Sequence, residues 1–326
     1  MIKRNLISLS ATAALLAWAS SFVPVYSQGT RSVREVNETK HDGEVTKSSS
    51  RFSWVESKNG VKVEVRVEGK VEMNDDYSDV ASIPSDGTFT VEDNRSGVAR
   101  RYRVVGRSGG ELARSYMVGG RERALDEEGH EWLRRVLSEA VREGGLFAKE
   151  RAQKILRERG ARGLSEELTH VRGDYVRRIY FEALVSSGNL DDATLAEALR
   201  SLRIGSDYER AQFLIKAADS SLGREKLVPI YFEAVGQIGS DYEHRRVLSA
   251  LIKKPNLSRD ALVAVIRSVV GVESDYEKAT FLIQVAHLNP DDERARAAFA
   301  DAVRTIGSDY ERGRVERAAA RRVVIN

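Results

Sequence analysis

Two periods of apolar residues divide the chain. Between residues 51 and 125 apolar and polar residues alternate, most regularly where Val61, Val63, Val65 and Val67 are separated by charged residues. A period of two is typical of a β-strand with one buried face, and Asn59-Gly60 just before this run favours a tight hairpin turn. The pattern therefore predicts an antiparallel β-meander with one wet face. Its further strands are expected at Phe89–Val91, Arg101–Val105, Leu112–Val118 and Arg121–Leu125.

From residue 126 the apolar residues follow a helical period. Residues 126–143 place Trp132, Leu133 and Val136 on one side, and we expect this helix to cover the apolar face of the sheet. Two shorter helical stretches, 147–159 and 164–170, follow. We interpret 126–170 as connecting helices that include a degenerate first repeat.

A hexapeptide recurs through the remainder of the chain. Ile-Gly-Ser-Asp-Tyr-Glu at 204–209 returns nearly unchanged at 238–243, 272–277 and 306–311, and a weaker copy lies at 171–175. The three full intervals are 34 residues, the length of a helix–turn–helix unit. We therefore predict an α+β multidomain protein. Its antiparallel β domain (51–125) is followed by an α-solenoid of about five helical hairpins over 171–326.

The hexapeptide also predicts how one helix ends and the next begins. Ser-x-x-Glu is the capping-box pattern, in which serine caps the helix and glutamate returns to the serine N–H. Gly205, Gly239 and Gly307 precede the caps. We expect these glycines to end the preceding helices in a left-handed conformation.

The N-terminus predicts export. In residues 1–27, Lys3 and Arg4 precede an apolar run and a small-residue cleavage pattern, which is typical of a signal peptide. An uncleaved membrane anchor is the alternative, since the run is nearly long enough to span a bilayer. Residues 28–50 are polar and without period, so we expect a flexible linker. The chain is thus expected to be periplasmic or secreted, with membrane contact only if the signal segment is retained.

Composition narrows the classes of partner. The chain has no cysteine and must be stable without disulfides. Its net charge of +3 falls to +1 when the signal peptide is removed, which is poor support for nucleic-acid binding. His130-Glu131 lacks the second histidine of a zinc-protease helix, and Ser108 lies between two predicted strands rather than at a nucleophile elbow. We expect no catalytic, metal or cofactor site, and no enzyme activity.

One pattern suggests an interaction surface. A base stands three residues after each repeat aspartate, and a tyrosine stands beside that aspartate. Either each base pairs with acidic residues in a charge ladder, or the bases and tyrosines form a stripe that binds an acidic partner. The candidate residues are Arg177, Arg210, His244, Lys278, Arg312, Tyr208, Tyr242, Tyr276 and Tyr310.

The chain resembles an uncharacterised secreted bacterial family with a β-rich domain and Ser-Asp-Tyr-Glu helical repeats. The resemblance rests on Met117–Glu122, on Trp132-Leu133 and on the hexapeptides, and it covers about residues 51–320. Related regions occur beside membrane metallopeptidases of the beta-lactam-sensor type, but this chain lacks any peptidase motif. The repeats are also similar in length to HEAT and tetratricopeptide repeats.

Together these features favour a non-catalytic, exported module that binds a protein or peptide, in envelope sensing or assembly. The alternatives are an enzyme or small-ligand carrier that uses the β domain, and a passive envelope spacer.

Overall fold

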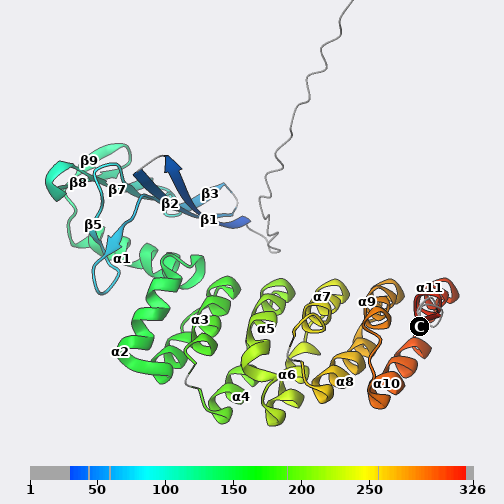
Figure 1. The fold of residues 1–326 in the computed structure, drawn as a ribbon. Helices are drawn as coiled ribbons and strands as arrows, with labels where there is room; N and C mark the ends of the chain where they lie inside the picture. Colours follow the sequence, from blue (N-terminus) through cyan, green and yellow to red (C-terminus); the bar gives the residue numbers. More distant parts are fainter. Residues whose placement is uncertain (1–29, 43–44, 59, 189, 256, 321–326) are drawn as a thin grey trace, which may run out of the picture.

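The protein consists of an antiparallel sheet and a two-layered helical array (Figure 1). The computed structural model describes residues 30–42, 45–58, 60–188, 190–255 and 257–320. The predicted signal peptide, 1–27, lies outside the described residues. Among the helices that are described, none is long and apolar enough to cross a membrane.

The sheet is the predicted meander. Its seven strands lie in the order β1-β2-β3-β6-β7-β8-β9, and every neighbouring pair is antiparallel. A two-stranded ribbon, β4-β5, lies within the connection from β3 to β6. The strands are β1 (Thr30–Asp42), β2 (Val45–Lys58), β3 (Val61–Glu68), β4 (Glu72–Met73), β5 (Val80–Ser82), β6 (Thr88–Asp93), β7 (Arg100–Gly106), β8 (Leu112–Val118) and β9 (Arg121–Arg123).

The structure corrects the prediction of a flexible linker over 28–50. Strand β1 and the start of β2 lie in this interval, and all thirteen residues of β1 pair with β2, from Thr30 opposite Ser57 to Asp42 opposite Val45. The apolar part of β2 is anchored in the core, and backbone pairing continues the hairpin beyond it. Backbone hydrogen bonding is indifferent to side-chain polarity, which is why a polar, aperiodic segment could be read as a linker.

One helix closes the sheet. Val63, Val65 and Val67 of β3 point into the same core as Trp54 and Phe89, while Arg66 is exposed on the other face. Helix α1 (Glu127–Glu139) adds the buried side chains Trp132, Leu133, Val136 and Leu137 to that core. The predicted cover of the apolar face is confirmed.

The connecting helices follow α1 directly. A π-helical turn, η2 (Ala140–Gly144), continues α1 and ends at Gly145 in a left-handed conformation. Helix α2 (Ala148–Leu168) is broken at Gly160, where φ is 64° and ψ is −167°. Its two halves correspond to the two short helices that the sequence predicts before the repeats.

The repeat region forms two layers (Figure 1). The helices that begin at the repeat aspartates, here called A helices, lie on the side where the sheet stands, and the B helices between them form the other layer. In the part of the chain that is described, four hairpins and a final single helix make up the array. The A helices are α3 (Asp174–Ser186), α5 (Asp207–Ser221), α7 (Asp241–Leu251), α9 (Asp275–Leu288) and α11 (Asp309–Ala320). The B helices are α4 (Asp192–Arg200), α6 (Val228–Val235), α8 (Arg259–Ser268) and α10 (Glu293–Arg304), and short 3-10 turns are η1 (Ser108–Gly110), η3 (Glu225–Leu227) and η4 (Val269–Gly271).

A single apolar core runs through the array. Phe213, Leu214, Phe281 and Leu282 of the A helices are fully buried, and Val265 is one of the B-helix side chains in the same cluster. Consecutive A helices pack against one another, as do consecutive B helices. Each hairpin therefore buries its apolar surface against its neighbours, as a solenoid requires.

Candidate interaction surface

The repeat serines cap the A helices. Each serine hydroxyl accepts a hydrogen bond from the backbone N–H of the glutamate three residues later, at 3.3 to 3.4 Å, in the predicted N-cap arrangement. The predicted return contact, from the glutamate side chain to the serine N–H, is wrong, because that N–H donates to an aspartate of the preceding repeat. The capping serines are Ser206, Ser240, Ser274 and Ser308.

The repeat aspartate joins consecutive A helices through a contact that we call the aspartate clamp. Asp207 accepts hydrogen bonds from the N–H groups of Gly239 (3.2 Å) and Ser240 (2.8 Å), one repeat further on. The backbone N–H groups of Gly307 and Ser308 hold the pKa of Asp275 below its usual range, because they stabilise the carboxylate. The same contact recurs from Asp174 to Ser206, from Asp241 to Glu273 and Ser274, and from Asp275 to Gly307 and Ser308.

The glycines before the caps are not left-handed, which corrects the predicted helix ends. None of the three has a positive φ. A Cβ on Gly205 or Gly307 would lie 3.3 Å from the clamping carboxylate of Asp174 or Asp275. Glycine is therefore favoured here by the close approach of the aspartate, although Glu273 occupies the same place in the fourth repeat.

Four of the five candidate bases donate to backbone carbonyls of the protein itself. Arg210 donates to the carbonyl of Ile204, at 2.6 Å. The buried Lys278 donates to the carbonyl of Thr305, and Arg177 and Arg312 also reach backbone carbonyls. His244 is buried and its Nε2 lies 3.0 Å from the Oγ of Ser268. Within the described part of the chain, the expected charge ladder is limited to contacts of Arg177 with Asp174 (3.7 Å) and of Arg312 with Asp309 (3.1 Å).

A second arrangement, absent from the sequence prediction, occupies each junction between A helices. One tyrosine of the earlier repeat and one glutamate of the later repeat enclose one arginine, and we call this set a junction triad. The guanidinium carbon lies 4.9 to 5.6 Å from the ring centre, within cation–π range. The triads are Tyr175–Arg178–Glu209, Tyr208–Arg246–Glu243, Tyr242–Arg245–Glu277 and Tyr276–Arg314–Glu311.

The triads hold their charges in partly buried surroundings. Burial raises the pKa of Glu209, and the adjacent Arg178 opposes that rise. The arginine belongs to the earlier repeat at the first and third junctions and to the later repeat at the second and fourth. A spacing rule between neighbouring residues could not find this alternation, because the position of the base changes from four to five residues after the aspartate.

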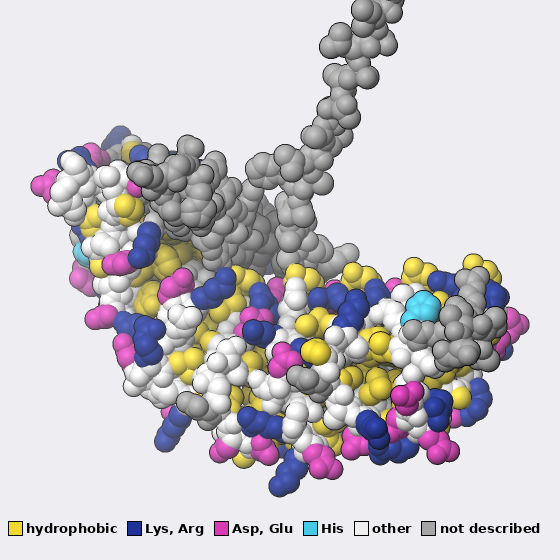
Figure 2. Space-filling model, viewed as in Figure 1, with side chains coloured by type: hydrophobic (Ala, Val, Ile, Leu, Met, Phe, Trp, Pro, Cys, Tyr) yellow, Lys and Arg dark blue, Asp and Glu magenta, His cyan; other side chains and the backbone are white. Residues whose placement is uncertain are grey.

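The tyrosines remain at the surface. Tyr242, Tyr276 and Tyr310 are 54, 57 and 72 % exposed, and Tyr208 is half-buried. Among the residues whose side chains are described, these three are the exposed Phe, Tyr and Trp residues. Figure 2 shows hydrophobic side chains, a class that includes tyrosine, recurring with Lys and Arg along the side of the array that faces the sheet. The tyrosine half of the predicted stripe therefore lies on the A layer, while His244 and Lys278 are buried and the three candidate arginines are partly buried.

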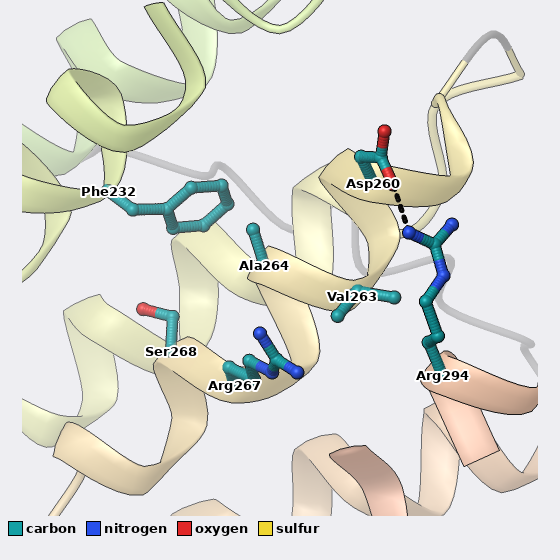
Figure 3. A pocket seen from close by; sticks show the side chains of 7 residues that line it. All are labelled: Phe232, Asp260, Val263, Ala264, Arg267, Ser268 and Arg294. Atoms are coloured by element: carbon teal, nitrogen blue, oxygen red, sulfur yellow. Dashed lines mark ion pairs between the residues drawn. The ribbon is translucent and has the colours of Figure 1, made fainter. Parts of the chain in front are cut away.

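A groove on the B layer is a second candidate (Figure 3). It has a volume of about 510 Å³ and lies between α6, α8 and α10. Phe232 forms an apolar wall, and Arg294 is paired with Asp260 at 2.8 Å. Its remaining lining residues are Val263, Ala264, Arg267 and Ser268.

Ser268 lines this groove, and its Oγ lies 3.0 Å from Nε2 of the buried His244, which is the spacing of a nucleophile and a base. A catalytic pair also needs a group that orients the imidazole. The nearby carboxylate of Asp241 is already bound by the N–H groups of Glu273 and Ser274. In the next repeat Lys278 holds the same position and donates to the carbonyl of Thr305 at the end of α10, so we assign the pair of His244 and Ser268 the same structural role.

The β domain offers little room for a ligand at its junction with the array. A cleft beside Phe52, Val67 and Phe147 has a volume of about 90 Å³, well below the roughly 300–1,000 Å³ of ordinary ligand pockets. Ser108 lies in η1, a turn between β7 and β8. Within the described ranges, no group of three or more His, Asp or Glu side chains is placed to hold a metal ion.

Comparison with protein-family models, with curated proteins and with solved structures found no match. The fold itself defines the class of protein, an antiparallel β domain joined to a helical-repeat array. The resemblance to a secreted bacterial family stays a prediction.

Proposed function

We propose that this protein is a non-catalytic interaction module that binds an extended polypeptide along the A layer. It would act outside the cytoplasm, in envelope sensing or assembly, where its N-terminal segment is expected to direct it. The observation that carries the proposal is the row of exposed tyrosines, Tyr242, Tyr276 and Tyr310, at one per repeat. Exposed aromatic rings are costly in water, and tyrosine is enriched at the centres of binding interfaces.

The junction triads support this proposal. An arginine beside each ring from Tyr175 to Tyr276 holds that ring in place, so little side-chain entropy is lost when a partner binds. Helical arrays commonly present such extended surfaces to their partners. The A layer therefore has both the area and the fixed aromatic groups that peptide binding requires.

The test is selection from a random peptide display library. The immobilised bait is the chain from Gln28 onward, and a variant with Tyr208, Tyr242, Tyr276 and Tyr310 all changed to Ser serves for counter-selection. We expect enriched peptides to bind wild type at least about tenfold more tightly than the variant, the loss typical of removing hot-spot residues. A control variant with Val98, Val270 and Leu288 changed to Ser, all exposed apolar residues outside the row, should bind like wild type.

Peptides that bind wild type and the tyrosine variant equally would contradict the proposal. A library that yields no enriched peptide would favour a passive spacer. We expect both variants to fold, because only exposed or half-buried side chains are changed, and circular dichroism checks this.

A further inference from the structure

The spacing of the tyrosines sets a length that a bound chain must match. They occupy the same position in successive A helices, and those helices pack directly against one another and are joined by the aspartate clamps. Packed helices have axes about 8–10 Å apart. A ligand that lies across the A helices therefore meets one tyrosine about every 8–10 Å.

Polypeptide conformations differ in how often they present the same face. A polyproline II helix has three residues per turn and a rise of about 3.1 Å, so one face recurs about every 9.3 Å. A β-strand repeats its face about every 6.6–6.8 Å and an α-helix about every 5.4 Å. Among these, the polyproline II helix alone keeps one residue per tyrosine from Tyr208 to Tyr310.

Charge complementarity favours an uncharged ligand. At every junction triad the arginine is already paired with a glutamate, and the repeat aspartates from Asp174 to Asp275 are bound by backbone N–H groups. Of the candidate bases, Arg177, Arg210, Lys278 and Arg312 bind backbone carbonyls, and His244 lies beside the hydroxyl of Ser268. An acidic ligand would thus meet triads in which each arginine already has a carboxylate partner.

The tyrosine hydroxyls can supply the polar contacts. A polyproline II backbone makes no internal hydrogen bonds and leaves its carbonyls available. Tyr208 accepts a hydrogen bond from the side-chain amide of Gln212 at 2.8 Å, which leaves its own hydroxyl proton to donate. Aromatic side chains with such donors are the usual means of binding proline-rich segments.

We propose that the A layer binds an uncharged, proline-rich segment in the polyproline II conformation, with every third residue seated beside a repeat tyrosine. This inference rests on the proposed function and specifies its ligand.

The test uses synthetic peptides of three, six, nine and twelve residues built from Pro-Pro-Ala, with Gly-Ser-Ala and Pro-Pro-Glu peptides of twelve residues as controls. Binding to the chain from Gln28 onward is measured by fluorescence anisotropy. We expect affinity to rise with each added triplet up to twelve residues, and both control peptides to bind at least about tenfold more weakly, which corresponds to about 1.4 kcal/mol. Changing Tyr242 and Tyr276 to Ala should cost about tenfold or more, and changing them to Phe should cost less, because the ring is kept.

Three results would overturn the inference. The first is equal binding of the proline and Gly-Ser peptides. The second is binding that does not depend on Tyr242 and Tyr276. The third is that the Pro-Pro-Ala peptides do not bind, while peptides without proline from the display selection bind in a tyrosine-dependent way. That third result would leave the proposed function standing. Binding of β-linked oligosaccharides with no peptide binding would overturn both proposals.

Discussion

The position three residues after the repeat aspartate is held by Arg177, Arg210, His244, Lys278 and Arg312. A base in the first turn of a helix opposes the dipole of that helix. The four bases other than His244 reach carbonyls in the segments that follow or precede their helix, such as those of Ile204 and Thr305, and His244 reaches the hydroxyl of Ser268. These carbonyls lie in turns outside the helices and are strong hydrogen-bond acceptors, so the unfavourable position is compensated in an adjoining turn.

His244 should make stability depend on pH near neutrality. Burial lowers the pKa of His244, and Asp241 opposes this only in part. The unfolded histidine takes up a proton near pH 6.5 while the folded one stays neutral, so the stabilisation is complete above about pH 6.5 and is lost as pH falls toward the folded pKa. We expect the free energy of unfolding to fall by about 1 kcal/mol between pH 7 and pH 5.

Urea titrations followed by circular dichroism at both pH values check this. The variant His244→Gln should show a smaller decrease between pH 7 and pH 5 than wild type. The exposed His287 provides the control, since His287→Gln should retain the wild-type decrease. Parallel pH slopes for wild type and His244→Gln would refute the assignment.

At the scale of the elements, the junction between A helices explains which features the sequence could predict. The N-cap of Ser240 was predictable, because a cap is a contact between residues three apart. The partner of its N–H was not, because the capping box competes with Asp207 of the preceding repeat, 33 residues away. The triad of Tyr208, Arg246 and Glu243 likewise forms only when two repeats are stacked.

Two equivalent aspartates provide a matched test of the clamp. Asp241 binds the N–H groups of Glu273 and Ser274 at 2.8 and 2.9 Å. Asp309 begins the last described A helix, and its side chain is 93 % exposed and paired with Arg312. Both occupy the first helical position, so both substitutions lose the same interaction with the helix dipole.

We expect Asp241→Ala to lower the free energy of unfolding by about 1–3 kcal/mol more than Asp309→Ala, because the former also removes charge-assisted hydrogen bonds. Urea denaturation followed by the helical signal at 222 nm gives both values. Equal losses in the two variants would mean that the aspartates act on their own helices alone.

At the scale of the whole molecule, the sheet and the array are joined by contacts that no local pattern could predict. The connection from β4 to β5 reaches α2, where Lys154 pairs with Asp75 at 2.6 Å and Arg151 stacks on Tyr77. The sequence predicted the meander, the covering helix and the repeats from their periods. It missed β1 and this connection, because backbone pairing and contacts between residues some 75 apart leave no period.

Arg151 is the centre of this join. Its guanidinium donates to Glu167 at 2.8 Å and to the hydroxyl of Tyr180 at 2.9 Å, and it lies 5.6 Å from the ring centre of Tyr77. Replacing it by Met would leave the carboxylate of Glu167 buried, without its closest charged partner and with Arg142 at 3.5 Å. Loss of one partner of a buried ion pair is strongly destabilising, and here we expect about 2–3 kcal/mol.

The two parts of the molecule can be followed separately, and this makes the join testable. Trp54 and Trp132 are both buried in the core of the sheet, so tryptophan fluorescence of the chain from Gln28 onward reports on that part, whereas the signal at 222 nm is dominated by the helices. In wild type the two unfolding midpoints should coincide. In Arg151→Met the helical midpoint should fall below the fluorescence midpoint, while Arg162→Met, on the exposed side of α2, should change neither. If both midpoints of Arg151→Met fall together, the sheet and the array unfold as one unit, held by their apolar contacts rather than by Arg151.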